Sequence, residues 1–215
     1  MISVKKFTFN PFMENTYVLF DETKECVIID PGCFSVEEEE ELSNFIDETQ
    51  LNPVMLWHTH SHLDHVFGSS FVANKYNIDL WIYKDDLQTL NAFNMVCKMY
   101  GIPVKNSPPN KCKFFNLSEG ISFGKSKIDI RFVPGHAPGH VVFISENSNF
   151  VINGDCLFDG SIGRTDLPGG NHQQLLESIR KELFSLDDKM VVYCGHGPET
   201  TIGKEKYSNP FLVKQ

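Results

Sequence analysis

The spacing of apolar and polar positions changes several times along the chain, and each change marks an expected element. Runs of β-branched and aromatic residues between polar turns predict strands. The predicted strands are Ile2–Phe9, Thr16–Phe20, Cys26–Ile29, Val54–Trp57, Leu80–Tyr83, Phe114–Leu117, Ile128–Val133, Val141–Ile144, Phe150–Ile152 and Met190–Cys194. These strands occur in both halves of the chain.

Apolar residues that recur every three or four positions predict helices between the strands. Ser35 with Glu38 is a capping-box signal at the start of the first helix. The other expected segments are helices over Phe67–Tyr76 and Asp85–Tyr100, a loop over Pro103–Lys113 and a helix after Asn171. Strands and helices in each half favour two stacked sheets with helices outside.

Composition and charge narrow the class of protein. The chain has 215 residues, of which 41% are hydrophobic and 22% charged, as in ordinary globular proteins. Its net charge of −9 argues against a nucleic-acid or anionic-membrane surface. No apolar run approaches the ~20 residues of a membrane span, and Asn10, Pro11 and Glu14 interrupt any signal-peptide core. We expect a cytoplasmic protein whose six scattered cysteines are free thiols.

A dense group of histidines follows the strand that ends at Trp57. His58, His60, His62 and His65 lie within eight residues, together with Asp64. Imidazole and carboxylate are natural ligands of zinc and similar ions. Extended backbone points His60 and His62 the same way, so one segment can serve two adjacent ions. Only the frame from His60 gives H-x-H-x-D-H, and we therefore expect His58 to pack at the strand end.

Four further segments complete a pattern in chain order. They are Asp30-Pro31-Gly32, Val133-Pro134-Gly135-His136-Ala137-Pro138-Gly139-His140, Asn153-Gly154-Asp155 and Cys194-Gly195-His196-Gly197-Pro198. With H-x-H-x-D-H, they resemble the motifs of the metallo-β-lactamase superfamily. The resemblance implies an α/β fold, a four-layer αββα sandwich of two mixed β-sheets flanked by helices, as a single domain over residues 1–215.

The resemblance also implies a site for two divalent metal ions. One ion would be held by His60, His62 and His136, the second by Asp64, His65 and His196, and Asp155 would bridge them. Asp30 is implied as structural support and His140 as a hydrogen-bonding neighbour. Zinc is the expected metal, although the same ligands accept iron or manganese.

Three residues near the motifs are expected to play other roles. His172 stands at a predicted helix start, so we place it on the surface or behind the ligands. Cys156 and Cys194 adjoin predicted ligands. We do not expect either thiol to bind metal, because the site is already complete with harder ligands.

The two implied metal ions would support a hydrolytic mechanism. Two ions ~3.5–4 Å apart share a water and lower its pKa from 15.7 toward ~7. The resulting metal-bridging hydroxide attacks a carbonyl carbon while a metal stabilises the oxyanion. Asp64 is the expected catalytic residue, because it would orient or deprotonate the nucleophile.

The segment Gly160–Gly170, with the sequence GSIGRTDLPGG, points to a substrate class. With Gly195–Gly203 and Asn209–Leu212, it resembles the short bacterial members of the glyoxalase II-like (hydroxyacylglutathione hydrolase-like) branch. That branch hydrolyses thioesters such as S-lactoylglutathione. Arg164 and Asp166 are predicted to form an ion pair that shapes the loop, and the alternative is that Arg164 meets a substrate carboxylate.

One departure from that branch affects the predicted substrate. Full-length glyoxalase II enzymes carry a helical C-terminal domain that helps to bind glutathione, whereas this chain ends soon after His196. Another small thioester, such as a bacillithiol or coenzyme A derivative, therefore stays open. The expected partner is a small-molecule thioester, with no nucleic acid or membrane, and the oligomeric state is not indicated.

Two other functions remain alternatives. A persulfide dioxygenase shares the G-R-T-D segment and the histidine set but uses a single iron. A catalytically inactive metal-binding module would hold metal and turn over no thioester. A β-lactamase would need an export signal, and a nuclease would need an inserted domain or exosite.

Overall fold

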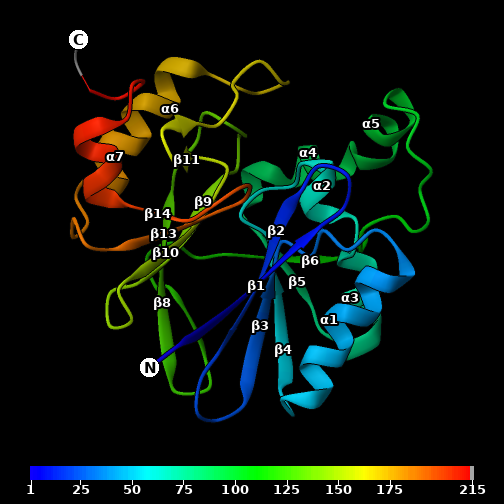
Figure 1. The fold of residues 1–215 in the computed structure, drawn as a ribbon. Coiled ribbons are helices and arrows are strands. Elements are labelled where there is room, and N and C mark those ends of the chain that lie inside the picture. Colours follow the sequence, from blue (N-terminus) through cyan, green and yellow to red (C-terminus); the bar gives the residue numbers. More distant parts are fainter. Residues whose placement is uncertain (214–215) are drawn as a thin grey trace.

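The computed structural model describes residues 1–213, whose longer strands form two mixed six-stranded sheets (Figure 1). In order across the first sheet, the strands are β1 (Ser3–Phe9), β2 (Glu14–Phe20), β3 (Glu25–Ile29), β4 (Asn52–Trp57), β5 (Leu80–Ile82) and β6 (Cys112–Phe114). β1 to β3 are antiparallel, and β3 to β6 are parallel. Parallel neighbours need crossover connections, and helices supply them.

The second sheet comes from the later part of the chain. Its order is β14 (Thr200–Thr201), β13 (Val191–Cys194), β10 (Phe150–Gly154), β9 (Val141–Ser145), β8 (Ser126–Phe132) and β7 (Ile121–Phe123). β10 and β13 are parallel, whereas the other neighbours are antiparallel. A small hairpin of β11 (Leu157–Phe158) and β12 (Ser161–Ile162) follows β10.

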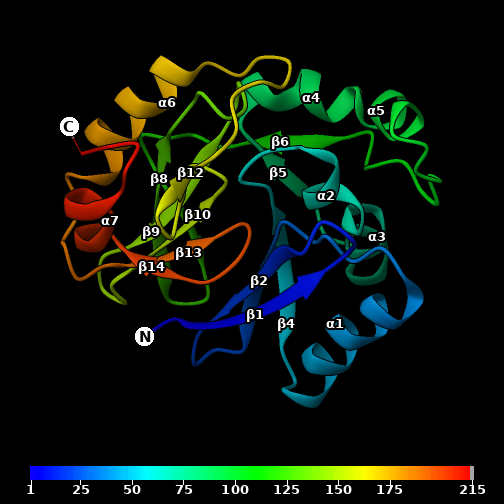
Figure 2. The same cartoon turned by 45° about the horizontal axis from the view of Figure 1, so that its top comes forward.

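Helices cover the two outer faces (Figure 2). Beside the first sheet lie α1 (Val36–Glu48), α2 (Leu63–Val66), α3 (Ser69–Tyr76), the 3₁₀ turn η1 (Lys84–Asp86), α4 (Leu87–Asn91) and α5 (Phe93–Met99). Beside the second lie α6 (His172–Ser178), the π-helical turn η2 (Ile179–Leu183) and α7 (Ile202–Ser208). None of the helices within residues 1–213 has the length and apolar character needed to cross a membrane.

Three buried apolar clusters separate these layers and confirm the predicted four-layer αββα sandwich. One lies between the first sheet and its helices, another between the second sheet and its helices, and the third between the sheets. In the third, Trp57 is fully buried and packs on Phe115, Phe123 and Phe143. Such aromatic pairs add about 0.5–1.5 kcal/mol each beyond their buried area, so they help to fix one sheet against the other.

The prediction of one helix over Asp85–Tyr100 is wrong. The segment begins with the turn η1 and then divides at Ala92 into α4 and α5. The Ala92 N–H is shared between the carbonyl oxygens of Gln88 and Thr89, a bifurcated bond that tightens a helix end. The helix expected from Phe67 begins at Ser69, and α2 precedes it.

The predicted strand Phe114–Leu117 is also wrong. β6 spans Cys112–Phe114, so the expected loop over Pro103–Lys113 ends earlier than predicted. The Phe115 N–H closes the ladder on the Ile82 carbonyl, and its ring enters the core between the sheets. Four short strands and two helices of the described chain had no prediction: β7, β11, β12, β14, α2 and α7. Strands of two or three residues are too short to show an alternating pattern.

Candidate metal centre

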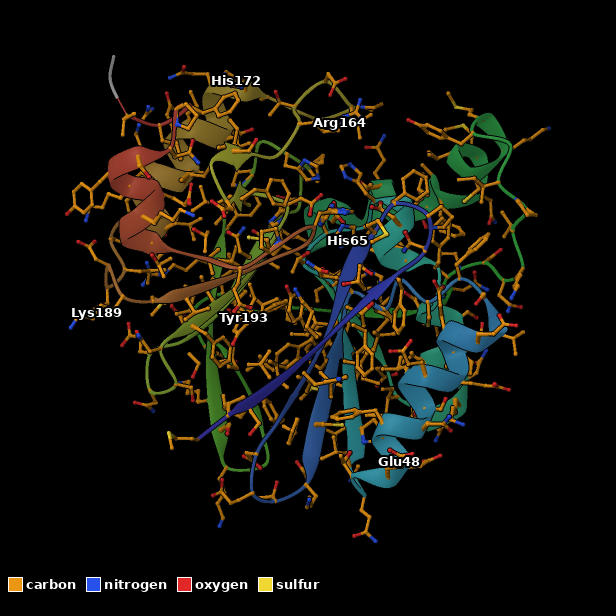
Figure 3. All side chains as sticks on the ribbon, in the orientation of Figure 1. Glu48, His65, Arg164, His172, Lys189 and Tyr193 are labelled. Atoms are coloured by element: carbon orange, nitrogen blue, oxygen red, sulfur yellow. The ribbon has the colours of Figure 1, made fainter. Side chains whose placement is uncertain are left out.

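The predicted donors meet at the edge where parallel strands end. β3 and β4 are parallel in the first sheet, and β10 and β13 are parallel in the second. The carboxyl ends of parallel strands lie at the same edge of a sheet, where sites commonly form. Each of these strands is followed by one motif, and the loop between β8 and β9 adds His136 and His140. Figure 3 shows His65 at this junction between the two halves of the molecule.

The structure brings His60, His62 and His136 into one group. Nε2 of His136 lies 2.9 Å from Nδ1 of His62 and 3.2 Å from Nε2 of His60. Burial, together with neighbouring imidazoles, lowers the pKa of all three imidazoles, that of His62 to about 3, although Asp155 opposes the shift at His62 and His136. The rings are therefore neutral near pH 7 and offer the lone pairs that a metal ion requires.

Asp64, His65 and His196 form a second group. Oδ2 of Asp64 lies 3.1 Å from Nε2 of His196 and 3.8 Å from Nε2 of His65. Burial alone would lower the pKa of both histidines, but Asp64 and Asp155 outweigh it and raise both pKa values. The two carboxylates therefore favour the protonated forms of these rings, so the second group favours positive charge at this place.

Asp155 lies between the two groups. Its Oδ1 is 3.5 Å from Nε2 of His65, and its Oδ2 is 3.6 Å from Nε2 of His136 and 3.5 Å from Nε2 of His196. Burial would raise the pKa of this carboxyl, but the surrounding imidazoles hold it well below its usual range. A Cβ at Gly195 would come within 2.1 Å of Oδ1, so glycine is required beside this carboxylate.

The donor set fits two divalent cations. It offers two neighbouring groups of nitrogen and carboxylate donors, which is the chemistry that zinc and related ions bind. Within residues 1–213, the buried atoms Nε2 of His65 and Oδ1 of Asp155 have no hydrogen-bond partner. Buried polar atoms without partners are costly, and a cation between them would satisfy both.

Hydrogen bonds on the far side of three rings fix their orientation. The pairs are His65 Nδ1 with Asp30 Oδ2 at 3.1 Å, His136 Nδ1 with the Arg164 carbonyl at 2.8 Å and His196 Nδ1 with the Phe12 carbonyl at 3.1 Å. Each oxygen is an acceptor, so each Nδ1 donates and Nε2 faces the site. Such outer partners set the tautomer of metal-binding histidines.

Asp30 holds Thr59 and His65 in place by hydrogen bonds. Its Oδ1 accepts the Thr59 main-chain N–H at 2.7 Å, and its Oδ2 accepts the Thr59 hydroxyl at 2.5 Å besides His65. The residue itself has a φ of 49°, a left-handed conformation that aspartate tolerates better than most residues. Asp30 thus ties the end of β3 to the segment that starts the histidine motif.

His140 lies behind the donors. Its Nε2 accepts the Asp155 main-chain N–H at 3.1 Å, and its Nδ1 lies 3.2 Å from Cys156 Sγ. The ring stacks on His60 with centroids 4.8 Å apart. His140 is therefore placed to orient Asp155 and His60.

The other singled-out histidines and cysteines lie outside the two groups. His58 Nε2 lies 2.7 Å from the Ser69 hydroxyl, so this ring faces α3. His172 is exposed at the start of α6, away from His65 (Figure 3). Cys156 and Cys194 are buried, and the six cysteines are free thiols within the described chain.

Arg164 and Asp166 form the expected ion pair. Nε and Nη2 of Arg164 donate to the two carboxylate oxygens at 2.8 and 2.7 Å. Both side chains are exposed, so the pair adds little to stability. The carbonyl of Arg164 orients His136, so the loop acts on the site through its backbone.

Sequence reasoning missed the contribution of the β1–β2 turn. Asn10 Nδ2 donates to the Asp64 carbonyl at 3.0 Å, and the Phe12 carbonyl accepts from His196. Glu14 is fully buried with Oε1 3.8 Å from Nδ1 of His65, and burial raises its pKa well above the usual range. The one sequence signal for this contribution was the charged residue Glu14 at the start of an otherwise uncharged strand.

The sequence is similar to a known family and to individual proteins. The sequence profile of the metallo-beta-lactamase superfamily matches residues 9–196. The chain belongs to this superfamily and is a metallo-hydrolase of that class. It is 36% identical to the hydroxyacylglutathione hydrolase GloC of Haemophilus influenzae. The aligned 202 residues cover 94% of this chain and 93% of that relative. The chain is 35% identical to the probable metallo-hydrolase YqgX of Bacillus subtilis, with coverage of 94% and 93%.

Solved structures support the same assignment. The B3 metallo-beta-lactamase BLEG-1 superposes with a TM-score of 0.89 at 33% identity, covering 99% of this chain and all of that one. TTHA1623, solved in a di-iron-bound form, gives 0.86 at 33% identity, with 97% and 100% covered. ETHE1 from Myxococcus xanthus gives 0.77 at 23% identity, with 97% and 83% covered, and shares the fold.

Proposed function

We propose that this metallo-hydrolase is a thioesterase that acts on S-lactoylglutathione or a related small thioester. The observation that carries the proposal is the pair of donor groups with Asp155 between them, since this set suits a two-metal hydrolase. The GSIGRTDLPGG segment beside the site and the likeness to hydroxyacylglutathione hydrolase GloC support a thioester substrate.

The metal would be held by His60, His62, His136, Asp64, His65, His196 and Asp155. When bound, two divalent ions supply an acidified water and polarise the substrate carbonyl. Zinc is the metal we propose, and TTHA1623, solved in a di-iron form, supports testing iron as well.

Asp64 is the proposed catalytic residue. Its side chain is partly exposed, unlike that of His65, and lies 3.1 Å from Nε2 of His196. Two imidazoles hold its pKa below the usual value, although burial opposes them. The carboxylate is therefore ionised and partly reachable from solvent, so it can orient a nucleophile or take its proton.

The net charge of the chain bears on the kind of substrate. A net charge of −9 suits a small molecule bound at a local cationic centre better than a polynucleotide. We propose a cytoplasmic enzyme that acts on a soluble thioester without a membrane or nucleic-acid partner. S-lactoyl derivatives of glutathione, bacillithiol and coenzyme A are the substrates to compare.

Purification without added metal, followed by elemental analysis and thioester assays on the same sample, tests the proposal. We expect two ions per chain, hydrolysis of at least one of these thioesters, and loss of activity on chelation that zinc restores. A matched oxygen ester is the control for non-specific hydrolysis. A protein that holds metal but turns over no substrate of the panel would instead be a binding module.

A persulfide dioxygenase is the second candidate, because Gly163-Arg164-Thr165-Asp166 stands beside the histidine set. This function would give one iron per chain and oxygen uptake with glutathione persulfide. Oxygen uptake without thioester hydrolysis would favour it over the thioesterase.

A further inference from the structure

Asp86 is a buried carboxylate outside the donor set. Asp86 ends the turn η1 after β5, and its residue is only 1% exposed. Neither carboxylate oxygen completes a hydrogen bond of good geometry with another group of residues 1–213. A buried carboxylate is costly without donors around it, so a role at this place needs an explanation.

The first neighbour of Asp86 belongs to the loop that carries His136. A Cβ at Gly139 would lie 2.2 Å from the Asp86 nitrogen and 2.3 Å from its Cβ. The loop thus rests directly on Asp86, with no room for a side chain between them. Gly139 directly precedes His140 and lies three residues after His136.

The second neighbour belongs to the loop that carries His60 and His62. Ser61 stands between these histidines, is buried, and has a hydroxyl without a good hydrogen-bond partner among the described residues. Burial raises the pKa of the Asp86 carboxyl to about 6, and hydroxyls of Ser61 and Thr89 with main-chain amides of Gly139 and Ser61 act against that rise. Donors from both histidine loops therefore face one carboxylate.

We propose that Asp86 is a positioning residue that holds the Ser61 and Gly139 loops together and so sets His136 against His60 and His62. Ring nitrogens from these two loops are in direct contact. Nε2 of His136 lies 2.9 Å from Nδ1 of His62 and 3.2 Å from Nε2 of His60. A small shift between the loops would separate the group. Asp86 touches neither metal nor substrate, and this inference rests on the proposed metal centre.

Zinc affinity measured by chelator competition tests the role of Asp86. The variants are Asp86→Ala and Asp86→Asn, with Asp85→Ala as a matched control because Asp85 is exposed on the same turn. We expect Asp86→Ala to bind zinc about 10–100-fold more weakly, the range for loss of an outer partner. The loss of affinity should fall mainly on one of the two bound zinc ions. Asp86→Asn should recover part of the affinity, and Asp85→Ala should bind zinc as tightly as the wild type.

Thermal unfolding of the metal-free variants separates positioning from simple stability. A variant that unfolds at a lower temperature, but binds zinc with wild-type affinity while it is folded, would overturn the proposal. Equal weakening of the binding of both zinc ions would also overturn it. If Asp86→Ala does not fold, Asp86→Asn and Ser61→Ala carry the test, and unchanged affinity in both overturns it. A wild type that binds two zinc ions but hydrolyses no thioester would defeat the proposed function alone.

Discussion

Nδ1 of His65 donates to Oδ2 of Asp30 across 3.1 Å, which joins the end of β3 to the second donor group. The same carboxylate accepts the main-chain N–H and the hydroxyl of Thr59, one residue before His60. One side chain thus orients His65 and anchors the start of the segment that carries the first donor group.

Replacing Asp30 with alanine should weaken metal binding by about 10–100-fold, because His65 and Thr59 lose their common acceptor. Competition with a chelator measures the change. Asp129→Ala is a suitable control, because its carboxylate is half-exposed and pairs with Arg131 rather than with any of the donors. Wild-type affinity in Asp30→Ala would show that Asp30 is dispensable for the site.

The substitution Asp155→Ala should abolish occupancy by two ions and remove hydrolysis. It deletes the carboxylate between the groups and leaves several imidazoles facing one another. The loss of activity should exceed the ~10–100-fold cost of an outer partner. Elemental analysis and the thioester assay on one sample measure both effects, and near-normal turnover would contradict the bridging role.

The His58→Ala variant tests the register of the histidine motif. His58 meets the Ser69 hydroxyl rather than the donors, so metal content and activity should stay close to those of the wild type. Loss of this buried contact should lower the free energy of unfolding by about 1–3 kcal/mol, as denaturant titration would measure. His60→Ala should instead lose metal, and an inactive, metal-free His58→Ala would reopen the register.

Metal binding should release protons near neutral pH. The pKa values of His65 and His196 are raised in the metal-free protein, so both rings are protonated until the pH rises past those values. A metal ion must displace these protons, and apparent affinity should therefore increase as the pH rises above the ordinary histidine pKa of about 6.5. Calorimetry in two buffers of different ionisation enthalpy counts the protons, and affinity independent of pH would contradict this ionisation.

Arg164→Ala distinguishes the two roles considered for that side chain. His136 is oriented by the Arg164 carbonyl, which the substitution keeps, and the exposed ion pair adds little because water screens it. We therefore expect nearly unchanged kcat, KM and unfolding temperature. A large rise in KM with unchanged kcat would show instead that the guanidinium binds a substrate carboxylate.

The sequence predicted the layers and the first histidine cluster from local patterns, and the full donor set followed from the family resemblance. Apolar runs such as Val141–Ile144 predicted buried strands, and the structure confirms the strand β9 there. The spacing of His60, His62, Asp64 and His65 indicated metal chemistry without knowledge of the fold. The prediction from periodicity failed at Ala92, where the expected helix divides although the apolar spacing continues across it.

Tertiary structure alone decided which distant groups support the donors. Glu14 approaches His65, Phe12 orients His196, and Asp86 lies against Gly139, although these partners are far apart in sequence. No periodicity predicts such pairs. The first forms when the first sheet assembles with α2, and the other two form when the sheets pack around Trp57 and bring their strand ends to one edge. Residue types therefore determine the chemistry that is available, and the packing of the sheets determines which groups meet.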